Sequence, residues 1–247
     1  MWRFLYQLAV PKNFYYQTQS ILTALGFGAL LFLLVGIGLG LFWAPPDYQQ
    51  GDAFRIIYVH VPAAFLSLTL YTAMGFLAVL LLIWRIKLAG LMLTVVAQLG
   101  ASMAFLALVT GSIWGKPMWG TWWIWDARLT SELILFLLYL AILATECAFE
   151  DPLKAEKVIA ILTLVGLIDL PIIHYSVYWW NTLHQGATLS LFAKPKIASV
   201  MFYPLLVTLI GFSLFCVWVV LHQTRTALLL RERRQRWVLE LVSGEKG

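Results

Sequence analysis

The chain has 247 residues, of which 62% are hydrophobic and only 12% are charged, and its formal net charge is +5. A soluble domain is about 45–50% apolar and about 25% charged, so this composition excludes a water-soluble globule and a disordered chain. It predicts an all-α integral membrane protein. Such a chain has little soluble surface, so its basic net charge does not indicate nucleic-acid binding.

Uncharged stretches predict where the helices cross the membrane. A spanning helix needs about 20 apolar residues, and four stretches of 28 to 34 residues carry no charge, so each holds one helix. Two further spans have charges near or within them. Glu132 and Glu146 lie at the ends of one, and the charged residue Asp169 lies within the apolar stretch of the other. The sequence therefore predicts a single membrane domain, 1–247, with six spans near residues 20–43, 57–84, 89–111, 130–148, 157–177 and 199–221.

The distribution of Lys and Arg predicts the orientation of these helices. With six spans both termini lie on the same side, which carries 12 of the 17 Lys and Arg residues, whereas the opposite side carries five. Cytoplasmic loops are enriched in Lys and Arg, so both termini are predicted to be cytoplasmic. The loops near 44–56, 112–129 and 178–198 then lie on the outer side.

Several familiar sequence motifs are absent. The chain has no P-loop for ATP hydrolysis and no H-E-x-x-H zinc motif. Cys147 and Cys216 are far apart, and no C-x-x-C-H motif for covalent haem attachment occurs. Gly36, Gly38 and Gly40 lie in the first span, where they predict close helix packing. The sequence therefore gives no sign of a P-loop ATPase, of an H-E-x-x-H zinc enzyme or of covalent haem attachment.

Tryptophan is concentrated in one stretch of the loop near 112–129, which we call the Trp segment (114–126). Five of the twelve Trp lie within twelve of its residues, with two Gly and a Pro. Trp favours membrane–water interfaces, so an aromatic belt is the simpler interpretation. On a helix of 100° per residue, however, the five rings cover about half the circumference. They predict a broad, flat wall for a large planar apolar ligand: Trp114, Trp119, Trp122, Trp123 and Trp125.

Cations beside the Trp segment suit a ligand with acidic groups at its edge. Lys116, Arg128 and Arg55 are most of the cations on the predicted outer side, and Arg can hold a carboxylate through two parallel hydrogen bonds. Asp126 is expected to orient the segment by accepting backbone or indole N–H bonds. Arg128 and Glu132 are four residues apart, so a helix-surface salt bridge is the alternative role for this pair.

Three of the four histidines fall on the predicted outer side. His60 lies near the outer end of the second span, His174 near the outer end of the fifth, and His184 ten residues later in a loop with paired Trp. A single His near a helix end is usually structural, but here imidazoles from different segments flank the Trp segment. Haem iron accepts axial imidazoles from both faces. The sequence therefore predicts haem as the ligand, held by His60 with either His174 or His184.

These residues resemble a known family. The Trp segment, continuing through 127–132, matches the WWD motif of the haem-handling protein superfamily, and the flanking histidines match its two-histidine arrangement. With six spans and 247 residues, the chain resembles the haem exporter protein C (CcmC) family of the system I cytochrome c maturation pathway. It does not resemble the larger haem lyase subunit, which has many more spans. The resemblance covers essentially the whole chain, and its other motifs are the runs 57–64 and 171–186.

The resemblance implies which residues hold the haem. His60 and His184 would be the axial ligands of a non-covalently bound haem b, and His174 would be structural. The ring would lie near the periplasmic face against the Trp segment, and cations would neutralise its propionates. The implied haem contacts are Trp114, Trp119, Trp122, Trp123, Trp125, Asp126 and Arg128, with Arg55 and Lys116 as possible propionate contacts.

The resemblance also implies a role and partners at the bacterial inner membrane. The chain would be a haem-presenting scaffold and not an enzyme. It would load haem onto the periplasmic haem chaperone CcmE during c-type cytochrome biogenesis. The ABC-type subunits CcmA and CcmB and the small membrane protein CcmD would act beside it.

Two other functions compete with haem delivery. The first is a membrane cytochrome or quinol oxidoreductase, but such enzymes usually hold haem between helices, deep in the bilayer. The second is a transporter that uses Asp169, because an ionisable group within a span is often functional. Asp169 also lies just before Pro171, where it is expected to accept backbone N–H groups.

Overall fold

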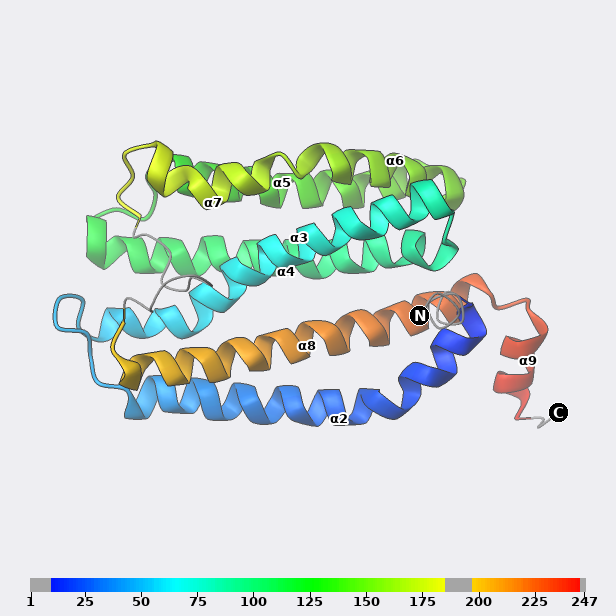
Figure 1. Ribbon diagram of the computed structural model, residues 1–247, viewed down its shortest axis with the longest axis horizontal. Helices are drawn as coiled ribbons and strands as arrows, with labels where there is room; N and C mark the ends of the chain where they lie inside the picture. The colour runs from blue at the N-terminus through cyan, green and yellow to red at the C-terminus, as the bar shows by residue number, and fades with distance from the viewer. Residues whose placement is uncertain (1–9, 185–196, 245–247) are drawn as a thin grey trace.

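The computed structural model describes residues 10–184 and 197–244. Within these ranges, six helical segments are long and apolar enough to cross a membrane, which confirms the predicted number of spans. The chain is a multi-pass, all-α bundle, and its helices run side by side in one elongated body (Figure 1). The helices are α2 (Pro11–Gly38), α3 (Ile57–Trp84), α4 (Lys87–Trp119), α5 (Ala127–Ala148), α6 (Pro152–Gly166), α7 (Asp169–Trp179), α8 (Ser199–Arg231) and α9 (Arg236–Ser243).

Several helix ends follow from local chemistry. Pro11 and Pro152 stand in the first turns of α2 and α6, where proline's missing N–H costs nothing. A π-helical turn (Leu39–Trp43) extends α2, and a 3-10 turn (Asp52–Ile56) precedes α3. The predicted span 57–84 coincides with α3. The predicted span 157–177 is split, because its helix is interrupted between Gly166 and Asp169.

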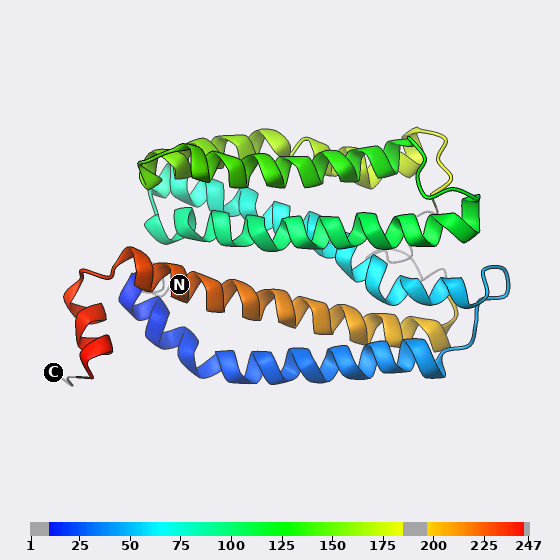
Figure 2. The ribbon, with the colours of Figure 1, turned by 180° about the vertical axis from the view of Figure 1, so that it is seen from behind.

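The bundle has three layers, formed by α2 with α8, by α3 with α4, and by α5 with α6 and α7 (Figures 1 and 2). The middle layer is the most buried: 61% of the apolar window of α4 lies inside the bundle, against 17% for α2. The core around α4 contains Tyr71, Leu93, Leu135, Tyr139 and Ile159, all fully buried. The outer face of α2 therefore remains available to lipid.

Close packing of α2 on α8 depends on glycine. A Cβ added to Gly36 would lie 2.5 Å from Oγ1 of Thr208, and one added to Gly211 would lie 2.7 Å from the backbone nitrogen of Leu33. Small residues allow such approach between membrane helices. The prediction of close packing is confirmed for Gly36 but is wrong for Gly38, whose Cβ would meet no atom within 4 Å.

One end of the bundle gathers the segments singled out by the sequence, and we call it the Trp-rich end. Here α4 ends, α5 begins, α7 ends, and both α3 and α8 begin (Figure 2). The start of α2 and the end of α8 lie together at the opposite end, as an even number of spans requires. The Trp-rich end is therefore where a site built from these segments can form.

Candidate functional site

His60 lies in the first turn of α3 and is buried at the Trp-rich end. Its Nδ1 is 3.1 Å from the carbonyl oxygen of Ala107 and 3.1 Å from the hydroxyl of Thr110, both on α4. A carbonyl oxygen can only accept, so Nδ1 carries the proton and Nε2 is the basic nitrogen of the neutral ring. A bond of this kind to a backbone carbonyl commonly orients a metal-binding histidine.

His184 lies beyond the end of α7, and its ring centroid is 6.3 Å from that of His60, with 38° between the ring planes. Two imidazoles that bind one metal ion from opposite sides have centroids about 6 Å apart, because each metal–nitrogen bond is about 2 Å and each ring radius about 1 Å. The observed separation fits one metal ion between the two rings. The sequence had left open whether His174 or His184 accompanies His60, and the structure brings His60 and His184 together.

The other two histidines lie in different surroundings. His174 is exposed on α7, and its ring packs edge-on against Tyr175 with a centroid distance of 4.8 Å. His222 lies towards the opposite end of α8, where its ring is 5.7 Å from that of Trp218. Both environments are those of surface histidines that pack on a neighbouring aromatic ring.

The number of ligands at the His60–His184 pair limits what it can hold. The described residues contain no group of three or more His, Cys, Asp or Glu side chains able to bind a metal ion. A zinc site takes three or four ligands from the protein. Two imidazoles suit an ion whose other positions are filled by its own macrocycle, as in haem. The donor set therefore fits haem better than a bare metal ion.

Trp114 forms the aromatic side of this pair. Its ring meets the His60 ring edge-on, with a centroid distance of 5.6 Å and an angle of 81°. It also packs edge-on against Phe54, and its indole N–H donates to Oε1 of Gln50 at 2.8 Å. Residues before α3 thus fix the orientation of Trp114, and sequence analysis did not identify either of them.

The Trp segment does not form the single flat wall that a helical projection predicts. Helix α4 continues through the first half of the segment to Trp119, and Gly120 follows it with a left-handed backbone, φ +77°. The chain changes direction there, so the spacing of 100° per residue does not describe the rings that follow Gly120. Trp119 still packs on the last turn of α4, against Gly115. Trp122 and Trp125 are 56% and 75% exposed, respectively.

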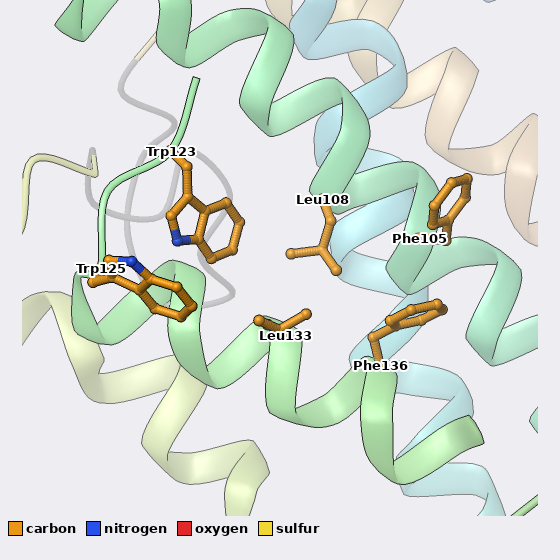
Figure 3. A pocket seen from close by; sticks show the side chains of 6 residues that line it. All are labelled: Phe105, Leu108, Trp123, Trp125, Leu133 and Phe136. Atoms are coloured by element: carbon orange, nitrogen blue, oxygen red, sulfur yellow. The ribbon is translucent and has the colours of Figure 1, made fainter. Parts of the chain in front are cut away.

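Trp123 and Trp125 line a shallow, largely open apolar cavity of about 350 Å³ between α4 and α5 (Figure 3). Their rings meet edge-on at 5.5 Å. The buried Nε1 of Trp123 has no hydrogen-bond partner within the described part of the chain. The Trp segment therefore contributes to two surfaces, with Trp114 beside the histidines and two later rings at this cavity. Its other lining residues are Phe105, Leu108, Leu133 and Phe136.

Asp126 connects the Trp segment to two neighbouring elements. Its Oδ1 accepts the backbone N–H of Leu129 at 2.8 Å and caps the start of α5, which confirms the predicted bond to a backbone N–H. Its Oδ2 accepts a hydrogen bond from the hydroxyl of Thr182, and that hydroxyl accepts the backbone N–H of His184 at 3.0 Å. Asp126 thus acts here through hydrogen bonds within the protein.

Arg128 and Glu132 make different contacts and no helix-surface salt bridge. None of the ion pairs among residues 10–184 and 197–244 joins them. Arg128 donates to the carbonyl oxygen of Ile173 at 2.6 Å, which ties α5 to α7. Glu132 is buried and accepts from the hydroxyl of Ser67 at 2.7 Å. The alternative of a salt bridge is wrong because both side chains turn towards neighbouring helices.

The two other predicted cations already have partners at the Trp-rich end. Arg55 pairs with Asp52 at 2.8 Å and donates to the carbonyl oxygen of Gly40 at 2.8 Å. Lys116 is exposed, and its ammonium donates to the carbonyl oxygen of Gly120 at 3.0 Å. Lys116 therefore braces the turn that ends α4, and Arg55 braces the connection between α2 and α3.

Comparison with known proteins identifies the family of this chain. The family model described as "CcmC: Heme exporter protein C" matches residues 4–239. The chain belongs to the haem exporter protein C family. A relative named "Heme exporter protein C" from Haemophilus influenzae is 48% identical over 242 residues, which are 98% of each chain. The protein of that name from Escherichia coli K12 is 47% identical over 98% of each chain, and that from Bradyrhizobium diazoefficiens is 43% identical over 96% of this chain and 89% of its own.

The CcmC family match spans every candidate residue, but the structure adds residues that sequence analysis missed. Thr110 orients His60, Gln50 orients Trp114, and Thr182 bonds to the backbone of His184. Only Thr182 carried a local signal, since a threonine hydroxyl often accepts the N–H two residues later in a turn. The other two contacts join residues far apart in sequence, and no local pattern predicts them.

Asp169 is the first residue of α7, directly after the interruption between α6 and α7. The start of α7 has no side-chain cap, so the expectation that this carboxylate accepts freed backbone N–H groups is not met. Its Oδ2 is buried without a hydrogen-bond partner among the residues that the structure describes. The hydroxyl of Tyr71 is likewise unpaired there. Asp169 is therefore part of the bundle interior and does not contribute to the His60–His184 pair.

Proposed function

We propose that this CcmC-family chain binds haem b non-covalently between His60 and His184 and presents it at the Trp-rich end for transfer. The 6.3 Å separation of the two rings carries the proposal, because it matches one metal ion with an imidazole on each side. The names of the relatives, "Heme exporter protein C", support the same ligand. The role is that of a scaffold for haem and not of an enzyme.

Each residue of the site has a distinct part in this function. His60 offers its basic Nε2 from a ring held by α4, and His184 offers the second imidazole from the loop after α7. Trp114 excludes water from the side of His60. The other rings of the Trp segment supply apolar surface for the haem edge, namely Trp119, Trp122, Trp123 and Trp125. Bound haem supplies an iron centre for the imidazoles and a planar apolar face for the indoles.

Cations at the Trp-rich end are proposed to contact the propionates. A guanidinium has five N–H donors, and the bond of Arg128 to Ile173 uses one of them. Lys116 is exposed and has three N–H donors, of which Gly120 accepts one. Arg55 is already neutralised by Asp52, so we rank it behind the other two.

Holding without a covalent bond agrees with the positions of the cysteines. Cys147 lies at the end of α5 away from the Trp segment, and Cys216 is buried within α8. Reversible ligation by neutral imidazoles suits a protein that must release its cargo. We propose that the Trp-rich end faces the periplasm at the inner membrane and that the chaperone CcmE receives the haem there. CcmA, CcmB and CcmD are the proposed membrane partners.

Absorption spectra of the purified full-length protein test the haem ligands. His60→Ala and His184→Ala should each reduce bound haem and change the spectrum of the remainder, because each removes one axial ligand. His174→Ala is the matched control and should keep the wild-type spectrum. Full haem retention by the variant lacking both His60 and His184 would overturn the proposal. Turnover of a quinol by the wild-type protein would favour the oxidoreductase instead.

A further inference from the structure

A chain of hydrogen bonds runs from the Trp segment to the backbone of His184. Asp126 uses both carboxylate oxygens: Oδ1 accepts from the N–H of Leu129 and Oδ2 accepts from the Thr182 hydroxyl. The Thr182 oxygen in turn accepts the N–H of His184 at 3.0 Å. The hydroxyl has one proton to donate and lone pairs to accept with. The donor and acceptor roles along this chain are therefore mutually consistent.

A side-chain hydrogen bond joins the segment that carries His184 to the start of α5. Helix α7 ends at Trp179, and the N–H of Trp180 makes the last backbone hydrogen bond of the helix, to Ser176. Residues 181–183 make no backbone–backbone hydrogen bond within the described part of the chain. The bond from the Thr182 hydroxyl to Asp126 crosses from this loop to the start of α5. It is a charge-assisted bond, which is the stronger kind.

We propose that Thr182 and Asp126 are positioning residues for His184, and this inference rests on the proposed function. Asp126 is fixed by the first turn of α5, and Thr182 transmits that fixed position to the backbone N–H of His184, two residues after Thr182. These bonds thereby fix the position of the His184 backbone relative to the Trp segment. This assigns Asp126 a role through His184, in place of the direct haem contact implied by family resemblance.

Removal of the Thr182 hydroxyl tests the positioning role. Thr182→Val keeps the shape of the side chain but cannot bond to Asp126, whereas Thr182→Ser keeps the hydroxyl. We expect Thr182→Val to lose haem about tenfold faster than wild type, since a hydrogen bond to a charged group is lost. Its spectrum should shift towards that of His184→Ala. Thr182→Ser should behave like wild type, as should Thr145→Val, which alters a half-buried threonine on α5 that bonds only to the carbonyl oxygen of Ala141 in its own helix.

Added imidazole separates positioning from folding. If His184 is merely misplaced, free imidazole should take its place at the iron and restore the two-imidazole spectrum of Thr182→Val. An unfolded site would not respond. A second measurement uses the double variant: because Asp126 and Thr182 act in one chain, Asp126→Ala with Thr182→Val should lose haem no faster than Asp126→Ala alone. Additive losses would overturn the inference.

The two proposals fail in different ways. If His184→Ala keeps the wild-type spectrum, the haem-ligand assignment fails, and the positioning role fails with it. If His184→Ala changes the spectrum but Thr182→Val does not, only the positioning role is refuted. If Thr182→Val does not accumulate in the membrane, Thr182→Ala provides the same test, and restoration of its spectrum by imidazole is again the expected result.

Discussion

Replacing Gly111 with alanine places a methyl group against the ring of His60. Gly111 lies on α4, beside the two groups that hold Nδ1 of His60. An added Cβ would lie 3.0 Å from Cε1 of the ring, 3.5 Å from Nδ1 and 4.0 Å from Nε2. Carbon atoms in contact are normally about 3.5–4.0 Å apart. The ring must therefore move by about half an ångström, away from the position in which Nδ1 bonds to α4.

Two opposing energies decide the outcome of this substitution. Overpacking a well-filled interior costs about 1–3 kcal/mol, whereas Gly to Ala within a helix stabilises by about 0.5–1 kcal/mol. We expect a net loss of about 1 kcal/mol in the free energy of unfolding. The loss of haem should be clearer, about tenfold faster than in wild type, because about 1.4 kcal/mol of ligation energy corresponds to a factor of ten.

The assay measures the rate at which purified protein loses haem to a soluble haem-binding acceptor, together with its visible spectrum and thermal unfolding. Gly38→Ala is the matched control, because an added Cβ at Gly38 would meet no atom within 4 Å. Gly38→Ala should keep wild-type haem retention and be neutral or slightly more stable. Equal haem retention by Gly111→Ala and Gly38→Ala would refute the reasoning that α4 confines the His60 ring.

Further predictions address packing and orientation. Gly36→Leu should separate α2 from α8, because even a Cβ would lie 2.5 Å from Oγ1 of Thr208; we expect a loss of about 1–3 kcal/mol, measured by thermal unfolding in detergent. Arg128→Met removes the bond to the Ile173 carbonyl and should cost about 1.5–3 kcal/mol by the same measurement. A periplasm-specific reporter fused after Gly120 should be active, and activity only of a cytosolic reporter at that point would reverse the proposed orientation.

Much of the fold follows from the spacing of charges. The uncharged stretch between Arg55 and Arg85 contains α3, because a charged side chain at mid-bilayer is costly and therefore marks the boundaries of a span. The break before Asp169 was not predicted: hydropathy averages over a window and is insensitive to two residues that leave the helix. The extension of α4 to Trp119 was also missed, because its last turns have the polar and aromatic composition of a loop.

The candidate site was predictable in part. His60 and the Trp segment stand out by residue type. The loop that carries His184 stands out because two adjacent Trp precede the histidine. The choice between His174 and His184 depends on how α7 ends, which local sequence does not determine. The prediction of a flat aromatic wall is wrong for a similar reason. Gly120 has a left-handed backbone and changes the direction of the chain in the middle of the Trp segment. Residue types thus indicated the chemistry, and backbone direction decided which side chains meet.

The two imidazoles of the proposed site belong to different kinds of element, and this bears on release. His60 belongs to a helix, and two groups of α4 fix its Nδ1. His184 belongs to a loop whose bond to the Trp segment passes through the hydroxyl of Thr182. Moving His60 would disturb the packing of α3 on α4, whereas moving His184 displaces a loop and breaks the bond from the Thr182 hydroxyl to Asp126. Under the proposed function, the haem would thus be held by one imidazole on a packed helix and one on a loop, and the loop would be the element that moves more readily.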